Sequence, residues 1–261
     1  MLIQTRSILG VKIHQISLEQ LRKLCIEWLA STMSHHIVTV NPEYVMAAQR
    51  DRSFAQILNS ADIAIADGAG IVFASKYLYG AQGQLVRITG TDFCWDLAQL
   101  CAQEGKRMYL LGSRSDEVLQ KAATAFRRAY PELNIVGMRG GISEQGSNEP
   151  YFKEFFKEAE MQALLDEIRA VAPDVLLVAY GAPKQDVWIA QHLKELPSVK
   201  IAIGVGGALD YAAGVVPRAS RVIRALGLEW LFRLAAQPIR RWRRIVTATI
   251  EFPLAVLRAK R

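Results

Sequence analysis

Short apolar runs alternate along the chain with longer segments of helical periodicity. The apolar runs end mostly in Gly, Asn, Asp or Ser and occupy residues 35–41, 62–67, 84–90, 107–113, 134–141, 174–181 and 200–207. Several are continuously apolar, which is typical of parallel strands covered on both faces. Residues 115–130 carry apolar side chains on one side and charges on the other, as an amphipathic helix does. The pattern predicts an α/β fold: a Rossmann-like, mostly parallel sheet with helices on both faces.

Charge divides the chain near Pro217. Residues 218–261 hold 11 of the 32 Lys and Arg but only two acids, Glu229 and Glu251. Their net charge is therefore +9, whereas the net charge of the whole chain is +7. The predicted organisation is therefore a Rossmann-like domain, residues 1–216, followed by a basic helical appendage, residues 217–261. Upstream, the charged segment 142–170, interrupted by Asn148 and Pro150, is interpreted as a surface insertion without chemistry.

The basic appendage predicts an anionic membrane surface as a partner. Arginines flank Trp242 among aliphatic residues, and each cation near such a surface contributes about 1 kcal/mol. No apolar run reaches the roughly 18 residues of a membrane span, and the N-terminus lacks a signal-peptide pattern, so we expect a cytoplasmic protein. A helical hairpin packed on the domain is the alternative. Nucleic-acid binding is disfavoured because the fold itself carries no basic excess.

The cysteines and histidines predict no metal site. Cys94 and Cys101 lie seven residues apart on one face of a predicted helix, so we expect these two and Cys25 to be buried, reduced and structural. The four histidines and the scattered acids have no ligand spacing. We therefore predict neither a metal nor another cofactor.

Asp67 is the first candidate functional residue. It follows a buried apolar strand and precedes a glycine turn. In an open parallel sheet, ligands bind beyond the carboxyl ends of the strands, and a helix beginning near Gly70 would place backbone N–H groups beside Asp67. A catalytic carboxylate is one interpretation of Asp67. A simple helix cap is the other.

Further polar residues follow other predicted strands. Thr39 and Asn41 can orient a sugar or phosphate or can serve as caps, and Arg87 can neutralise a phosphate or form a surface ion pair. Gly181 precedes a helix whose first turn holds Lys184 and Gln185, where an anion is favoured.

Two glycine turns suggest nucleotide binding more weakly. Gly112 lies in a strand-to-helix turn, which is weakly suggestive of phosphate binding. Gly204 and Gly206 satisfy the first two positions of a dinucleotide fingerprint, but Leu209 occupies the third position and Arg224 stands where an acid is needed. This failure counts against an NAD-type enzyme.

The motifs TVNPEY, SADIAIADGAGIVFASK, RITGTDF, YLLGS, YGAPKQD, GVGGALDYAAG and GLEWLFRL resemble, in order and spacing, the WecG/TagA/CpsF family of bacterial glycosyltransferases, glycosyltransferase family 26. The resemblance covers nearly the whole chain. It implies inverting transfer of a sugar from a UDP donor to a polyprenyl-diphosphate-linked sugar, without a bound metal, on a Rossmann-like fold. It also implies an appendage that engages the membrane and helps to complete the active site.

The resemblance assigns roles to individual residues. Asp67 matches the general base and Arg87 the arginine of RxTGTD, while Thr39, Asn41 and Gln185 match positions near the donor. Asp210 matches an aspartate close to the uridine, although Leu209 replaces the usual Phe and Asp186 stands where Glu is commoner. Five appendage arginines are candidates for the membrane or the acceptor diphosphate: Arg218, Arg221, Arg224, Arg233 and Arg240.

The predicted function is a UDP-sugar-dependent hexosyltransferase of cell-surface polysaccharide synthesis. The donor carries an N-acetylmannosamine-type sugar, a related hexose or a uronic acid, and the acceptor is a lipid-linked saccharide. We expect a peripheral protein on the inner face of the plasma membrane that binds no nucleic acid, and the sequence allows a homo-oligomer. An NAD-type oxidoreductase and an RNA-binding α/β protein with a basic tail are the alternatives.

Overall fold

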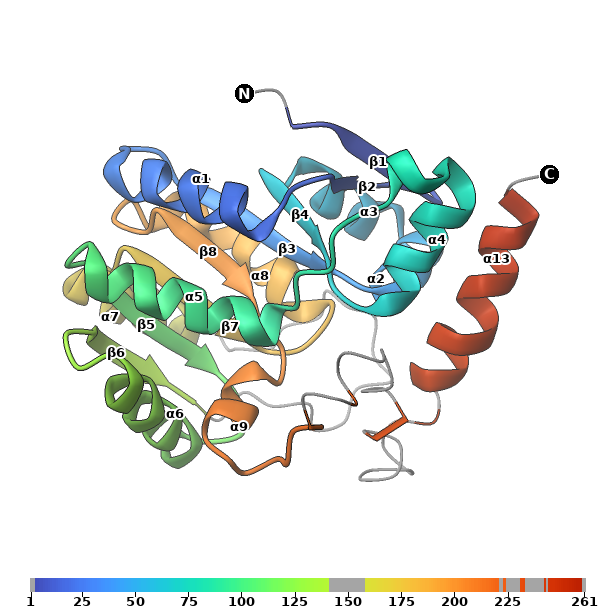
Figure 1. Cartoon of the computed structure of the whole chain (residues 1–261). Coiled ribbons are helices and arrows are strands. Elements are labelled where there is room, and N and C mark those ends of the chain that lie inside the picture. The colour runs from blue at the N-terminus through green and yellow to red at the C-terminus, as the bar shows by residue number, and fades with distance from the viewer. Residues whose placement is uncertain are drawn as a thin grey trace. The chain divides into compact units, whose positions relative to one another are not determined.

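The computed structural model describes residues 3–140, 158–220, 223, 231–232, 242 and 244–259 (Figure 1). Its strands are β1 (Thr5–Ile8), β2 (Val11–His14), β3 (His35–Val40), β4 (Ile63–Ala66), β5 (Arg107–Gly112), β6 (Asn134–Arg139), β7 (Val175–Ala179) and β8 (Ile201–Gly204). Its α-helices are α1 (Leu18–Ala30), α2 (Pro42–Arg50), α3 (Arg52–Ser60), α4 (Ala69–Tyr79), α5 (Gly90–Gln103), α6 (Asp116–Ala129), α7 (Glu158–Val171), α8 (Lys184–His192), α9 (Ala208–Ala212) and α13 (Phe252–Ala259). Short 3-10 turns η1 (Ala81–Gly83) and η2 (Leu193–Glu195) and a π-helical turn η3 (Thr247–Glu251) complete the described elements.

Six strands form the main sheet in the order β4-β3-β8-β7-β5-β6. The pairs β3/β8, β8/β7, β7/β5 and β5/β6 are parallel, with Val175 opposite Ile201 at the centre. Every residue of β7 and β8 is buried. In Figure 1, α1 and α5 lie in front of the strands and α7 and α8 behind them. The predicted α/β class and parallel sheet are confirmed.

One predicted strand is absent, and one hairpin was not predicted. Residues 84–90 form no strand, because only Arg87 bridges the edge strand at Ala66 and helix α5 begins at Gly90. The antiparallel hairpin of β1 and β2 was missed. Its two-residue turn has positive φ at both Leu9 and Gly10, 49° and 80°. Such turns are usually recognised by Asn-Gly or Asp-Gly, and this chain has leucine at the first position.

The interpretation of residues 142–170 as a surface insertion is wrong for α7. Leu164, Leu165 and Ile168 are buried in a core cluster with β5 and β7 residues. Residues 141–157 lie outside the described part of the chain. Charged residues on the outer side of the helix concealed the narrow apolar face, which made the segment resemble an exposed one.

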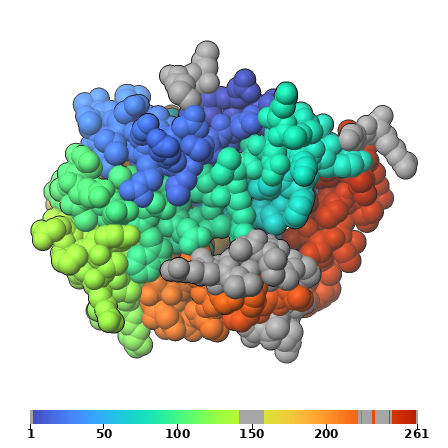
Figure 2. All heavy atoms as spheres, in the orientation of Figure 1, coloured from blue at the N-terminus to red at the C-terminus, as the bar shows by residue number. Residues whose placement is uncertain are grey.

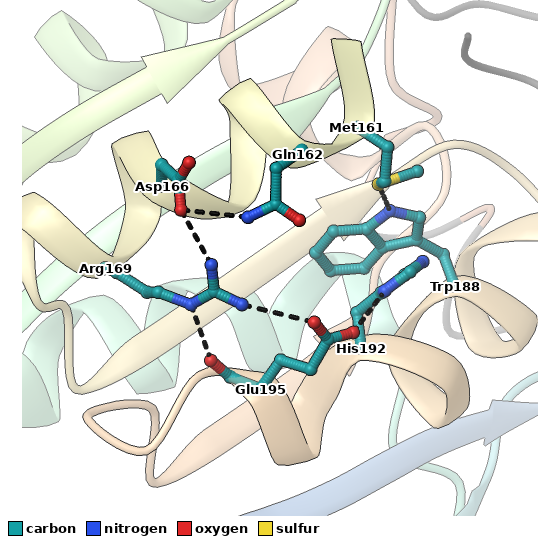
Figure 3. A network of polar contacts seen from close by, with 7 residues as sticks. All are labelled: Met161, Gln162, Asp166, Arg169, Trp188, His192 and Glu195. Carbon is teal, nitrogen blue, oxygen red and sulfur yellow. Dashed lines mark hydrogen bonds and ion pairs between the residues drawn. The ribbon is translucent and has the colours of Figure 1, made fainter. Parts of the chain in front are cut away.

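A polar network also holds α7 in place (Figure 3). Arg169 donates to the backbone oxygen of Glu195 at 3.0 Å and to its Oε2 at 3.1 Å. His192 Nδ1 lies 2.9 Å from Glu195 Oε1, and Trp188 Nε1–H donates to Met161 Sδ at 3.3 Å. These contacts join α7 to α8 and η2, so the network has a structural role.

The chain divides into two compact units. Unit 1 comprises residues 1–17, 39–89 and 217–261, and unit 2 comprises residues 18–38 and 90–216. The switch of units after Val216 coincides with the predicted domain boundary. Within unit 1, however, helix α13 packs against α2 and α4 through Phe252 and Val256, both of which are buried. The separation of residues 217–261 as a domain of its own therefore stays a prediction.

Cys25, Cys94 and Cys101 are buried free thiols, as the sequence predicts. Burial raises the pKa of Cys25 to about 12 and also raises the pKa of Cys101. Thiolates are the reactive form, so both side chains are expected to be inert in the folded protein. No described helix is long and apolar enough to cross a membrane.

His14 is expected to make stability depend on pH. Its Nδ1 accepts a hydrogen bond from the backbone N–H of Ala64 at 2.9 Å and so joins β2 to β4. Burial lowers the pKa of His14 below its ordinary value of about 6.5. The unfolded chain then takes up the proton first, so this stabilisation is complete above that value and is lost as the pH falls through the lower, folded pKa.

Thermal unfolding of the wild type and of His14→Gln across this pH range measures the effect. The wild type should lose more of its Tm on acidification than the variant, which keeps a side chain of similar reach but does not titrate. Parallel pH profiles would show that His14 does not supply the pH dependence.

Candidate active site

The Asp67 turn is set by two neighbouring strand ends within unit 1. The Asp67 N–H donates to the backbone oxygen of Val40 at 2.8 Å, which aligns the end of β4 with the end of β3. Gly68 follows with φ of 103°, a conformation that favours glycine. Gly68 occupies the N-cap position of α4, and Asp67 directly precedes it. The half-buried carboxylate stands at the carboxyl end of the strand.

Arg87 lies beside the same strand end. Its backbone bridges Ala66 in parallel, and the N–H of Ile88 donates to the Ala66 oxygen at 3.0 Å. Asp67 is the next residue after Ala66. The two predicted catalytic residues are thus brought to one edge on paired backbones. Their catalytic roles stay predictions.

Thr39 and Asn41 flank the end of β3. Thr39 is buried, and the Asn41 side-chain oxygen caps α2 by accepting from the Tyr44 N–H at 3.0 Å. Capping is therefore one role of Asn41, and its amide N–H₂ can still donate to a ligand. A Cβ on Gly70 would lie 2.9 Å from Pro42 Cγ, so the beginnings of α2 and α4 are in close contact there.

A second cluster forms in unit 2 around Asp210. Gly112 and Ser113 both have positive φ, 95° and 67°, and a Cβ on Gly112 would lie 2.8 Å from the Ala179 carbonyl carbon. This turn lets Ser113 Oγ donate to Asp210 Oδ1 at 2.7 Å and Arg114 Nε donate to Oδ2 at 3.0 Å. Both oxygens of a largely buried carboxylate are thereby held by one turn.

Gly112 and Asp210 were both predicted as substrate-binding residues, and the turn that begins at Gly112 contacts Asp210 through Ser113 and Arg114. Ser113 and Arg114 were missed as partners of Asp210. The only sequence signal for them was the strand-to-helix turn after YLLG, because 97 residues separate Ser113 from Asp210.

The glycine loop after β8 holds the side chain of Gln185. Gln185 is buried, and its Oε1 accepts from the Gly206 N–H at 2.8 Å. A Cβ on Gly204 would lie only 2.4 Å from Gln185 Nε2. The loop therefore has a physical role that explains its glycines without a dinucleotide, which agrees with the failed fingerprint.

The other predicted residues of this motif lie at the start of α8. Gly181 has φ of 81°, and Lys184 is the partly exposed first residue of the helix. Asp186 is fully buried, and its Oδ1 lies 3.2 Å from Nε2 of His36 on β3. His36, which the sequence did not single out, thus anchors the first turn of α8 to the sheet.

The arginines of the appendage are only partly described. Arg218 is half-buried in unit 1, whereas Arg221, Arg224, Arg233 and Arg240 lie outside the described residues. Arg244 was not among the predicted acceptor residues. Its Nε donates to Glu43 Oε2 in the first turn of α2. Arg244 of the appendage is therefore bound to Glu43, which is two residues after Asn41 in the sequence.

A family model described as Glycosyl transferase WecG/TagA/CpsF family matches residues 6–261. The match spans both units and nearly the whole chain. It confirms the resemblance that the seven motifs carry.

Proposed function

The chain belongs to the WecG/TagA/CpsF family of glycosyl transferases, and on this premise we propose that it moves a hexose or uronic acid from a UDP donor to a polyprenyl-diphosphate-linked sugar with inversion. The family makes the protein a glycosyltransferase of cell-surface polysaccharide synthesis. The observation that supports the finer proposal is the backbone bridge between Ala66 and Arg87, because it brings Arg87 next to the strand end that Asp67 follows.

Asp67 acts as the general base in this proposal. The acceptor hydroxyl gives its proton to the Asp67 carboxylate while its oxygen attacks the anomeric carbon and the bond to the UDP oxygen breaks. A positioned base of this kind contributes roughly 10²- to 10⁴-fold to the rate. The position of Asp67 at the carboxyl end of a strand, beside a glycine turn, supports this role.

Arg87 balances the charge of the departing group. As the bond breaks, negative charge accumulates on the UDP diphosphate, and a guanidinium can hold two of its oxygens at once. The N-terminus of α4, directly after Gly68, offers backbone N–H groups to the same charge. No step of this scheme requires a metal ion.

The unit 2 clusters supply donor-binding groups. Asp210, held by Ser113 and Arg114, suits the uridine, while Gln185 and Lys184 at the start of α8 suit the sugar and the phosphates. The seat that Gly204 and Gly206 form around Gln185 favours this use over NAD binding.

The lipid-linked acceptor fixes the proposed location. The +9 appendage would bring the protein to the anionic inner face of the plasma membrane, where the acceptor diphosphate lies.

A ligand comparison tests the proposal. UDP should raise the Tm of the protein and NAD should not, because only the nucleotide that binds the folded state stabilises it. Transfer to a lipid-diphosphate-sugar acceptor should continue in EDTA. Stabilisation by NAD alone, or a strict requirement for Mg²⁺ or Mn²⁺, would contradict it.

Arg87→Ala should lower kcat by about 10²-fold or more, because one charge-stabilising group is removed from the transition state. Arg52→Ala, which removes an exposed arginine of the same unit on α3, is the matched control and should retain wild-type kcat. Steady-state kinetics of both variants measure the difference. A kcat for Arg87→Ala within about twofold of the control would place Arg87 in an ordinary surface ion pair.

A further inference from the structure

The outer side of α4 carries exposed aromatic residues. Ile71 and Ala74 of this helix are buried, whereas Phe73 is 70% exposed and Tyr77 is 42% exposed. Gly70, Phe73 and Tyr77 occur at i, i+3 and i+7, so they lie on one side of the helix. Large apolar side chains this exposed, next to each other on a helix, are typical of a contact surface.

Helix α13 carries a second exposed apolar stripe in the same unit. Its buried residues, Phe252 and Val256, face α2 and α4. Leu254 and Leu257 of α13 and Ile250 of the preceding turn η3 are 47%, 47% and 52% exposed.

The two stripes lie on neighbouring helices. The Cβ position of Gly70 is 3.9 Å from Phe252 Cε1, so α4 and α13 touch on the side of α4 from which Phe73 and Tyr77 also project. Figures 1 and 2 show α4 and α13 beside each other. We give the name α4–α13 surface to seven exposed residues of α4, α13 and the turn η3: Phe73, Lys76, Tyr77, Ile250, Leu254, Leu257 and Arg258.

The charge of these segments identifies the partner. Residues 68–91 contain no Asp or Glu but include Lys76 and Arg87, and residues 252–261 contain no acid but include three cations. Glu251, which lies between Ile250 and Phe252, is paired with Arg50 at 2.8 Å. Aromatic and aliphatic side chains accompanied by an excess of cations are complementary to anionic lipid headgroups over acyl chains. We propose that the α4–α13 surface binds an anionic bilayer, with Phe73 of the catalytic fold inserted alongside the appendage.

This contact would also keep the active site close to the lipid. Phe73 lies five residues after Gly68, which is about 8 Å along the axis of α4 at 1.5 Å per residue. Asp67 directly precedes Gly68. A base that must reach a sugar on a lipid diphosphate has to lie near the membrane surface, and a contact along the side of α4 would hold Asp67 near that surface. The inference deepens the proposed function and rests on it for the chemistry of the acceptor.

Site-directed fluorescence tests the contact without any sugar transfer. The native thiols are buried, so Phe73→Cys and Leu254→Cys can be labelled selectively with an environment-sensitive fluorophore. Met33→Cys, at a 66% exposed position of unit 2, is the matched control. With vesicles of phosphatidylglycerol and phosphatidylethanolamine, labels at positions 73 and 254 should shift to the blue and be quenched by spin-labelled lipid, and the label at position 33 should not respond.

Partitioning into the same vesicles gives the second readout. Phe73→Ser should weaken binding about 10-fold, as loss of one buried aromatic side chain predicts, while Met33→Ser should stay within about twofold of wild type. Quenching at position 254 without quenching at position 73 would overturn the role of α4. The proposal would also be overturned if the label at position 73 made no contact with vesicles and the protein formed a concentration-dependent dimer that Phe73→Ser dissociates. That result would identify a second copy of the chain as the partner.

The UDP thermal shift separates this inference from the proposed function. Lipid contact at Phe73 in a protein that UDP does not stabilise would support the surface and refute the donor. Stabilisation by UDP without lipid contact at Phe73 would support UDP as the donor and refute the α4–α13 surface as the membrane contact.

Discussion

Asp67→Asn is expected to lower kcat by about 10²- to 10⁴-fold while the Kd for UDP stays within about threefold of wild type. The amide keeps the size and shape of the side chain but cannot accept the acceptor proton. A general base acts in the transition state and contributes little to donor binding in the ground state, so the two quantities should separate. Steady-state kinetics and calorimetric titration with UDP measure them.

Asp62→Asn is the matched control for this variant. Asp62 is an exposed carboxylate that immediately precedes β4, whereas Asp67 immediately follows the same strand. It should retain both turnover and UDP affinity. Near-normal turnover of Asp67→Asn would remove Asp67 as the base, and an equal loss of UDP affinity would make it a donor ligand instead.

Gly204→Ala is expected to disturb both stability and turnover. The new Cβ would lie 2.4 Å from Gln185 Nε2, so the buried amide must move and give up its hydrogen bond with the Gly206 N–H. Overpacking and the loss of a buried hydrogen bond each typically lower the free energy of unfolding by about 1–3 kcal/mol. If Gln185 contacts the donor as proposed, its displacement should also lower kcat/KM. Denaturant unfolding and steady-state kinetics give the two effects.

Gly207→Ala separates this clash from a general sensitivity of the loop. Gly207 has φ of −77°, and its Cβ would lie 4.0 Å from Tyr211 Cε2, an ordinary contact. This variant should fold and turn over as the wild type does. Equal stability and turnover of Gly204→Ala and Gly207→Ala would mean that the space beside Gly204 is not what Gln185 requires.

Continuous apolar runs predicted the interior of the sheet well, because strands covered on both faces leave little ambiguity. The runs at β5, β7 and β8 became parallel strands, and the polar start of residues 115–130 became the Ser115 cap of α6. The edges were harder to predict. The β1–β2 hairpin has short strands and a Leu-Gly turn, and the run near Arg87 makes a single bridge in place of a ladder.

The site residues likewise divide into those that local sequence marks and those whose partners are distant in the sequence. Asp67 could be placed at the sheet edge because a continuous apolar run marks the strand before it, and strand ends of a parallel sheet share one edge. Arg87 reaches the same edge through a single bridge, although the strand predicted around it is absent. Their catalytic roles stay predictions. Ser113, Arg114 and His36 could not be found from local sequence, since their roles depend on Asp210 and Asp186, which are about 100 to 150 positions away. The glycines at positions 204 and 206 were visible, but their purpose became clear only once Gln185 was seen beside them.

Transfer with identified stereochemistry tests inverting catalysis by Asp67 most directly. The protein is incubated in EDTA with UDP-linked N-acetylmannosamine, glucose or their uronic acids and a short-chain lipid-diphosphate-GlcNAc acceptor, and the product is analysed by NMR. We predict that one UDP-sugar is consumed, that the new bond has the anomeric configuration opposite to that of the donor, and that Asp67→Asn forms almost no product. Retained configuration, or transfer by Asp67→Asn at the wild-type rate, would contradict that role.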